Sequence, residues 1–126
     1  MPKSSPTISM DELRKLITTK QKYALIDVRE PHELQFGMIP TAKNLPLTEL
    51  PLALTLSDTE FKARYRFKKP TAKDTLILYC RTGGRSERAA LFMRGKGYAA
   101  RNYKGSIWEW STIDPSVKRY GPEPRH

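Results

Sequence analysis

Cysteine and long apolar stretches are both scarce in this chain of 126 residues, and each shortage excludes a class of protein. The single cysteine, Cys80, cannot form a disulfide within the chain, which fits a reducing compartment. No run approaches the ~18 consecutive apolar residues that a membrane-spanning helix requires. Because residues 1–10 also lack the apolar core of a secretory signal, we expect a protein of the cytoplasm or the mitochondrial matrix, neither secreted nor embedded in a membrane.

Acidic residues are few beside the basic ones: 13 Asp and Glu stand against 23 Lys and Arg, for a formal net charge of +10. Such an excess attracts anions of every size, from small oxyanions to nucleic acids. Most of the basic residues are dispersed, as on an ordinary solvated surface, and only residues 61–69, "FKARYRFKK", form a local cluster. No motif of a nucleic-acid-binding module accompanies this cluster, so we expect no nucleic-acid partner and regard an acidic protein as the alternative.

Helices are predicted where a serine precedes a glutamate by three residues, because the two side chains can cap a helix start reciprocally. The pairs are Ser9 with Glu12, Ser57 with Glu60, and Ser106 with Glu109. The first pair opens a helix over residues 10–20, whose apolar side chains share one face. A further helix follows the cysteine and ends at Gly95 or Gly97, and shorter helical segments are expected at residues 31–37 and 47–54.

Strands are predicted at short runs that are apolar and partly β-branched. The runs are "YALIDV", "AKNLPL", "DTLILYC" and "AARNYKG". Because strands alternate with helices, the predicted fold class is α/β: a mainly parallel sheet of about five strands with helices on both faces. We expect one domain over residues 9–113, an N-terminal arm over residues 1–8 and a flexible C-terminal tail over residues 114–126.

The clearest strand runs directly into Cys80, and ligands of a parallel sheet bind beyond the carboxyl ends of its strands. A thiol reacts as its thiolate, which cations, helix N-termini and converging N–H groups stabilise. Arg81 and Arg85 supply positive charge, and the next helix directs its dipole at the sulfur. Gly83 and Gly84 let the backbone curl, so that successive amides converge. The sequence therefore favours a nucleophilic cysteine in an anion-binding cradle over a structural cysteine at a strand end.

The length of the loop separates two kinds of cysteine chemistry. Protein tyrosine phosphatases use Cys-x5-Arg, a loop that encircles a tetrahedral phosphate. Here four residues separate Cys80 from Arg85, and a serine follows. A loop that is one residue shorter should be too tight for a phosphoryl group, but it suits a single sulfur atom. The count favours sulfur transfer over a phosphatase or arsenate reductase of the same fold.

Four stretches resemble, in the same order, the motifs of the single-domain rhodaneses, a family of thiosulfate sulfurtransferases. They are "LIDVREPHE" for Asp-Val-Arg-x-x-x-Glu, "GMIPTAKNLP" for Gly-His-Ile-x-Gly-Ala-x-Asn, "YCRTGGRS" for the loop Cys-x-x-Gly-x-Arg-Ser, and "NYKGSIWEW" for Gly-Gly-x-x-x-Trp. Met38 replaces the usual His and Thr41 the usual Gly, at positions where we expect no effect on the chemistry. Ser106 stands at the second Gly and Trp110 is the closing tryptophan, so the resemblance covers about residues 9–110.

The resemblance implies a two-step cycle that requires no metal and no organic cofactor. The Cys80 thiolate attacks the outer sulfur of thiosulfate, sulfite leaves, and the Cys80 persulfide passes its sulfur to cyanide, glutathione or another thiol. A sulfur-carrier or regulatory interaction module with little turnover is the alternative within the same family, although such modules usually lack the active cysteine. A monomer or a weak dimer would suffice for the reaction.

The resemblance also implies roles for the loop residues. Cys80 is the nucleophile, and the backbone of the loop cradles the thiolate and the persulfide. The cradling loop comprises Arg81, Thr82, Gly83, Gly84, Arg85 and Ser86. Arg81 and Arg85 are expected to bind the sulfonate end of the donor, with a pairing of Arg85 to a carboxylate as the alternative.

Three residues outside the loop are expected to support it. Asp27 and Arg29 would hold the neighbouring loop edge through hydrogen bonds, and Trp110 would pack under the catalytic loop. The two histidines, His32 and His126, have no partners at the spacing of metal ligands. We therefore expect no metal site.

Overall fold

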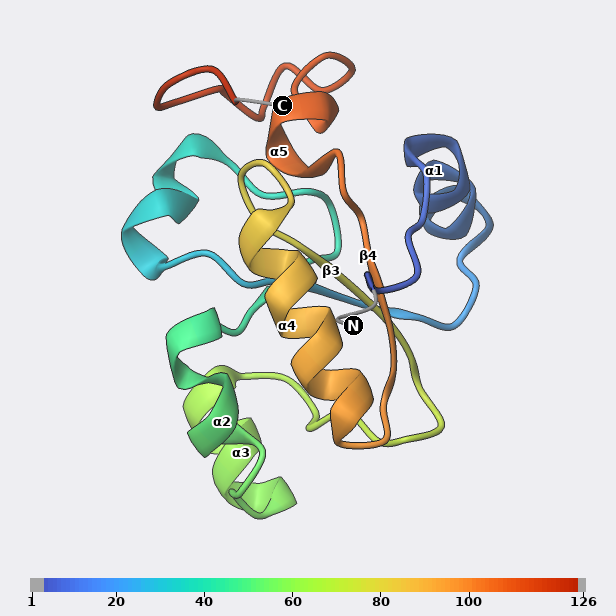
Figure 1. Ribbon diagram of the computed structural model, residues 1–126, viewed down its shortest axis with the longest axis vertical. Coiled ribbons are helices and arrows are strands. Elements are labelled where there is room, and N and C mark those ends of the chain that lie inside the picture. The colour runs from blue at the N-terminus through green and yellow to red at the C-terminus, as the bar shows by residue number, and fades with distance from the viewer. Residues whose placement is uncertain (1–3, 125–126) are drawn as a thin grey trace.

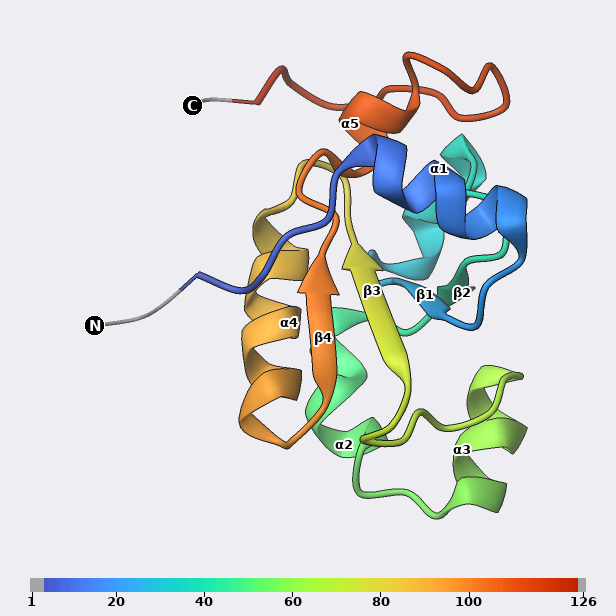
Figure 2. The same cartoon turned by 90° about the vertical axis from the view of Figure 1, so that its right-hand side faces the viewer.

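The computed structural model describes residues 4–124 and contains a sheet of four parallel strands with helices on both faces (Figures 1 and 2). The elements follow one another as α1 (Met10–Thr19), β1 (Ala24–Asp27), η1 (Pro31–Phe36), β2 (Lys43–Asn44), η2 (Leu47–Glu49), α2 (Leu50–Ala53), α3 (Asp58–Tyr65), β3 (Thr75–Tyr79), α4 (Gly84–Gly95), β4 (Ala99–Asn102) and α5 (Ser106–Trp110). The strands lie in the order β2-β1-β3-β4, and every neighbouring pair is parallel. The α/β class, the parallel sheet and the two helical layers are confirmed.

The sheet has four strands, fewer than the five or so that the sequence predicted. Where a fifth strand would add to the outer edge of β4, the N-terminal arm makes a single bridge between Thr7 and Asn102. The Asn102 amide donates to the carbonyl of Pro6 at 2.8 Å, and the Ile8 amide donates to the carbonyl of Asn102 at 3.1 Å. The pairing stays short because Pro6 has no N–H and Ser9 already caps α1.

Two separate apolar clusters fill the space on the two faces of the sheet. Leu76 and Leu78 of β3 belong to the cluster under α2, α3 and α4, whereas Ile77 and Tyr79 belong to the cluster under α1 and α5. Figure 2 shows α4 and α1 on opposite sides of the strands. Because both faces are covered, β3 is apolar throughout rather than alternating, as the run "LILY" indicated.

The capping predictions hold for two helices and fail for the third. The serine and glutamate at the starts of α1 and α3 exchange the two hydrogen bonds of a capping box. At α5 the pair Ser106 and Glu109 does not do so, and Gly105 precedes the helix. Ser106 Oγ instead accepts a hydrogen bond from the Cys80 amide at 3.1 Å, and Glu109 accepts one from the Tyr103 hydroxyl at 2.7 Å. A residue predicted to cap a helix therefore holds the loop after β3.

The segment that follows α5 packs against the domain, whereas the sequence predicted a flexible tail from residue 114. Val117 is only 3% exposed and lies in the cluster under α1 and α5. The carbonyl of Ser116 lies so close to Gly37 that a Cβ there would approach it to 2.4 Å. This packing could not be predicted from a local pattern, because isolated side chains rather than a periodic run make the contacts. His126 and residues 1–3 lie outside the described residues.

The basic cluster at residues 61–69 combines exposed basic side chains, among them Lys62, Arg66 and Lys68, with aromatic side chains that pack inward. Phe61 is buried and Phe67 packs against the same apolar cluster. Lys69 Nζ donates to two backbone carbonyls, and Arg64 pairs with Glu49 at 3.4 Å.

Within residues 4–124, no helix has the length and apolar character needed to cross a membrane.

Candidate active site

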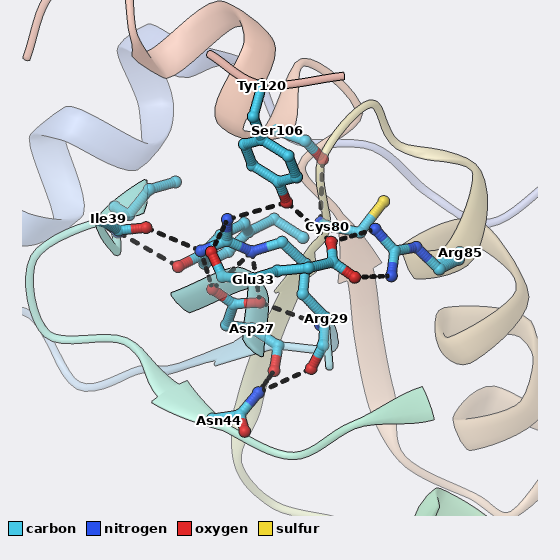
Figure 3. A network of polar contacts seen from close by, with 11 residues as sticks. Asp27, Arg29, Glu33, Ile39, Asn44, Cys80, Arg85, Ser106 and Tyr120 are labelled. Atoms are coloured by element: carbon cyan, nitrogen blue, oxygen red, sulfur yellow. Dashed lines mark hydrogen bonds and ion pairs between the residues drawn. The ribbon is translucent and has the colours of Figure 1, made fainter. Parts of the chain in front are cut away.

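Cys80 directly follows β3 at the carboxyl edge of the sheet, where the sequence predicted it. The loop 80–86 leads from this strand into α4, and the thiol is only 1% exposed. Asp27 ends β1 and Asn102 ends β4, so the two neighbouring strands bring polar residues to the same edge. Figure 3 shows Cys80 beside a network of charged side chains that extends from this edge.

The loop surrounds the sulfur with donors. The Gly83 amide donates to Cys80 Sγ at 3.0 Å, and the Ser86 hydroxyl lies 3.5 Å from the same sulfur. Gly83 has φ of +100°, and a Cβ at this position would lie 2.3 Å from the carbonyl oxygen of Lys104. Both facts require glycine here, since an L side chain would be strained and would collide with backbone. The cradle predicted from "CRTGGRS" is therefore present as geometry.

The cradle lowers the pKa of the Cys80 thiol. Burial acts in the opposite direction and raises it, but hydrogen bonds from the side chain and amide of Ser86 and from the amides of Gly83 and Thr82 together outweigh burial. The Ser86 hydroxyl has one proton, and Asn102 Oδ1 at 2.6 Å is a nearer acceptor than the sulfur. The backbone amides are therefore the most direct stabilisers of the thiolate.

Residues from β4 and α5 fix the backbone of the loop. Ser106 Oγ accepts from the Cys80 amide, and the Ile107 amide donates to the Cys80 carbonyl at 3.1 Å. The Trp108 amide donates to the Arg81 carbonyl at 2.9 Å. Asn102 Nδ2 donates to the Gly83 carbonyl at 3.2 Å. Because these partners come from rigid elements, the amides that face the sulfur are positioned before any ligand binds.

The two arginines of the loop have partners within the chain. Arg85 forms a two-pronged ion pair with Glu33, with both N–O distances at 2.7 Å, which is the carboxylate alternative that the sequence left open. Arg81 Nη1 donates to the carbonyls of Tyr120 at 2.9 Å and Pro122 at 2.8 Å. The Arg85 side chain keeps 30% exposure.

The ion pair shifts the pKa of both partners. Hydrogen bonds from Arg85 hold the pKa of Glu33 at about 2, although burial works against this, and the Tyr120 hydroxyl adds to the lowering. Glu33 in turn raises the pKa of Arg85, and the charge of Cys80 contributes to the same rise. A permanent positive charge therefore interacts with the thiolate.

Comparison with known proteins agrees with this geometry. The sequence profile of the Rhodanese-like domain family matches residues 9–113. The chain belongs to this family. It is 40% identical over 108 residues to the human thiosulfate:glutathione sulfurtransferase, an alignment that covers 84% of this chain and 93% of that protein. It is 36% identical over 110 residues to the thiosulfate sulfurtransferase RDL2, mitochondrial, of Saccharomyces cerevisiae, covering 86% and 74% respectively.

Solved structures give the same result for the fold. The structure of the human single-domain sulfurtransferase TSTD1 superimposes with a TM-score of 0.82 at 38% identity, over 87% of this chain and 98% of that chain. The rhodanese-like fold predicted from the four motifs is therefore confirmed.

Asp27 and Arg29 form a fully buried ion pair in this rhodanese-like domain, with Nη2 and Oδ2 2.7 Å apart. Arg29 also donates to the carbonyls of Glu33 and Gly37. Asn44 Nδ2 donates to the carbonyls of Asp27 and Arg29, which ties β2 to this pair. These contacts support the structural role expected for both residues, since each buried polar group has a partner.

The sequence predicted that Trp110 packs under the catalytic loop, but two tryptophans of the rhodanese-like domain lie in this region, and they make different contacts. Trp110 packs edge-on against Tyr103, with ring centroids 6.2 Å apart, in the cluster under α1 and α5. Trp108 lies against the loop itself, because the guanidinium of Arg81 is 5.6 Å from its ring centroid. The prediction singled out Trp110 through the family motif and did not consider its neighbour.

For several residues of the site, the sequence predicted no role in the site itself. They are Glu33, Asn44, Asn102, Ser106 and Tyr120. Glu33 lies within the stretch "LIDVREPHE", so the motif held a signal for it. Tyr120 follows the family motifs in a segment without periodicity, and nothing in the sequence distinguished it.

Proposed function

We propose that this rhodanese-like domain is a thiosulfate sulfurtransferase that carries the transferred sulfur as a persulfide on Cys80. The observation that carries the proposal is the convergence of backbone amides on Cys80 Sγ: the Gly83 amide lies at 3.0 Å, and the amides of Thr82 and Ser86 also lower the pKa of the thiol. The four residues between Cys80 and Arg85 suit a sulfur atom rather than a phosphoryl group. Two relatives whose names include thiosulfate and sulfurtransferase support the same reaction.

In the first half-reaction, the Cys80 thiolate attacks the outer sulfur of thiosulfate. The S–S bond of thiosulfate breaks, sulfite leaves with the electron pair of that bond, and Cys80 carries a persulfide whose terminal sulfur is negative. The amides of the loop stabilise the negative sulfur before and after the transfer. The step consumes no oxidant, because the sulfur arrives already bonded to sulfur.

In the second half-reaction, an acceptor thiolate attacks the terminal sulfur, forms its own persulfide and releases Cys80 as a thiolate. Glutathione is the acceptor that we propose first, because the human relative is named for it. Cyanide would yield thiocyanate by the same displacement. The net charge of +10 would also suit an acidic protein as acceptor.

The cycle needs one chain, so we propose a monomer or a weak dimer. It also needs a compartment in which Cys80 stays reduced, which supports the cytoplasm or the mitochondrial matrix. The yeast relative RDL2 is named as mitochondrial.

Mass spectrometry after incubation with thiosulfate tests the proposal. We expect one added sulfur on Cys80, which cyanide removes as thiocyanate. Cys80→Ser is the control, and thiocyanate production by this variant at the parent rate would refute the mechanism. A persulfide that forms but does not turn over would favour the carrier or regulatory module. Hydrolysis of p-nitrophenyl phosphate would favour the phosphatase or arsenate reductase alternative.

A further inference from the structure

Tyr120 lies beyond residues 9–113, the part of the chain that matches the family profile, yet its side chain reaches the active-site network. Its hydroxyl donates to Glu33 Oε2 at 2.7 Å and accepts from Arg29 Nη1 at 3.1 Å. The Glu33 carboxylate is the one that Arg85 holds with two hydrogen bonds. Glu33 is therefore shared between Tyr120 and Arg85, and Figure 3 shows it between them.

The backbone around Tyr120 holds the other arginine of the catalytic loop. Arg81 Nη1 donates to the carbonyls of Tyr120 and Pro122. The Arg81 guanidinium also lies 5.8 Å from the ring centroid of Tyr120 and 5.6 Å from that of Trp108. One short segment thus contacts, directly or through Glu33, both arginines of the loop.

Packing contacts keep this segment in place. The ring of Tyr120 stacks on Phe36, with centroids 4.2 Å apart and planes 13° from parallel. The Lys118 amide donates to the Phe36 carbonyl at 2.8 Å, and Val117 is buried beside it. The hydroxyl therefore meets Glu33 from a ring whose position is already determined.

The charge on Glu33 bears on the reactivity of Cys80. Arg85 and Cys80 belong to the same loop, and Figure 3 shows their side chains next to each other. The positive charge of Arg85 therefore favours the thiolate, whereas the carboxylate of Glu33 partly cancels this effect. A hydrogen bond from Tyr120 spreads part of the carboxylate charge away from Arg85 and fixes the carboxylate plane. The electrostatic potential of Arg85, at the sulfur and at the site of an incoming dianion, therefore depends on the Tyr120 hydroxyl.

We propose that Tyr120 is a positioning residue of this site. Through Glu33, it determines where the Arg85 guanidinium lies and how strongly its positive charge acts on the sulfur. The role in thiosulfate binding rests on the proposed function, whereas the effect on the Cys80 thiol does not. The residue acts through others, since no contact joins the Tyr120 hydroxyl to the loop itself within residues 4–124.

Tyr120→Phe tests this inference, because it removes the hydroxyl and keeps the ring that stacks on Phe36. Tyr65→Phe is a matched control: the Tyr65 hydroxyl donates to Glu49 at 2.8 Å, and Glu49 pairs with Arg64, in the same arrangement away from the loop. The rate of Cys80 alkylation by iodoacetamide is measured against pH. Steady-state assays give KM for thiosulfate and kcat separately, and thermal unfolding reports whether each variant is folded.

For Tyr120→Phe we expect the midpoint of the alkylation profile to rise by about half a pH unit and KM for thiosulfate to rise about threefold. These changes are those expected when one hydrogen bond to a charged group is lost and only part of its effect reaches Arg85. We expect kcat to change less than KM, and Tyr65→Phe to behave as the parent. The inference is overturned if Tyr120→Phe shares the parent alkylation midpoint and KM, or if Tyr65→Phe shifts them equally.

A double-mutant cycle shows whether Tyr120→Phe affects the Cys80 thiol through the Glu33 carboxylate or only by destabilising the fold. If Tyr120 acts through the carboxylate, Tyr120→Phe should have no further effect on the alkylation midpoint in a Glu33→Gln background. An unchanged effect in that background would contradict the inference. Should the parent show no sulfur transfer at all, the proposed function fails, and the alkylation profiles still decide the role of Tyr120.

Discussion

At the scale of single residues, the active-site loop depends on one backbone conformation. Gly83 combines φ of +100° with a close approach to the Lys104 carbonyl, and its amide faces the sulfur. We expect Gly83→Ala to lose more than tenfold in turnover and about 2 kcal/mol or more in stability, because the loop must shift away from Cys80.

The neighbouring glycine provides the control for this prediction. A Cβ at Gly84 would meet nothing within 4 Å, and this residue begins α4. Gly84→Ala should therefore keep turnover and the thermal midpoint close to the parent values. Equal losses in the two alanine variants, measured by thiocyanate assay and thermal unfolding, would contradict the argument from φ.

The carboxyl group of Glu33 gives the stability a predictable pH dependence. Its pKa of about 2 in the fold lies below the ordinary value of 4.5. A carboxyl group whose pKa is lower in the folded than in the unfolded protein stabilises the fold fully at a pH above its unfolded pKa. This stabilisation is lost as the pH falls through the folded pKa. Urea midpoints of the parent should exceed those of Glu33→Gln above pH 4.5, and the difference should disappear between pH 4.5 and about 2.

Glu49→Gln is the comparison for that experiment, since the partner Arg64 is exposed and lies at 3.4 Å. Exposed ion pairs contribute little, so its urea midpoint should follow the parent at every pH. A gap between parent and Glu33→Gln that persists at pH 2 would show that the ion pair with Arg85 is not its source.

At the scale of elements, serines in similar sequence contexts have different tasks. Ser57 caps α3, so Ser57→Ala should cost about 1 kcal/mol in stability and leave kcat unchanged. Ser106 accepts from the buried Cys80 amide, so Ser106→Ala should leave that amide unpaired and reduce turnover as well. Paired measurements of thermal unfolding and thiocyanate formation check this. Equal kcat in both variants would contradict the assignment of Ser106 to the loop.

The elements also show which parts of the structure a sequence can predict. Strands such as β3 and helices such as α1 follow from local patterns, and the thiol cradle follows from strand, glycines and helix in one stretch. The partners of Arg81 and Arg85 do not, because Tyr120 and Glu33 lie 39 and 52 residues away along the chain. Contacts at such separations depend on tertiary packing, which leaves no local pattern.

At the scale of the whole molecule, the net charge of +10 should act on the donor. Thiosulfate is a dianion, and salt screens its attraction to a positive protein over a Debye length of about 8 Å at 0.15 M. We expect kcat/KM for thiosulfate to fall severalfold as ionic strength rises. Alkylation by uncharged iodoacetamide should be nearly insensitive to salt, and an equal decline in both rates would point away from steering.

Because Cys80 is only 1% exposed, the two half-reactions differ in how closely the reagent must approach the loop. In the resting protein a donor must insert its sulfur into the loop, so a slender reagent with a protruding terminal sulfur has the advantage. Once the persulfide forms, the reactive atom is the terminal sulfur, one S–S bond of about 2 Å beyond Sγ. If this bond points towards the mouth of the loop, we expect the loaded protein to pass its sulfur to bulkier molecules than those from which the empty protein can accept sulfur.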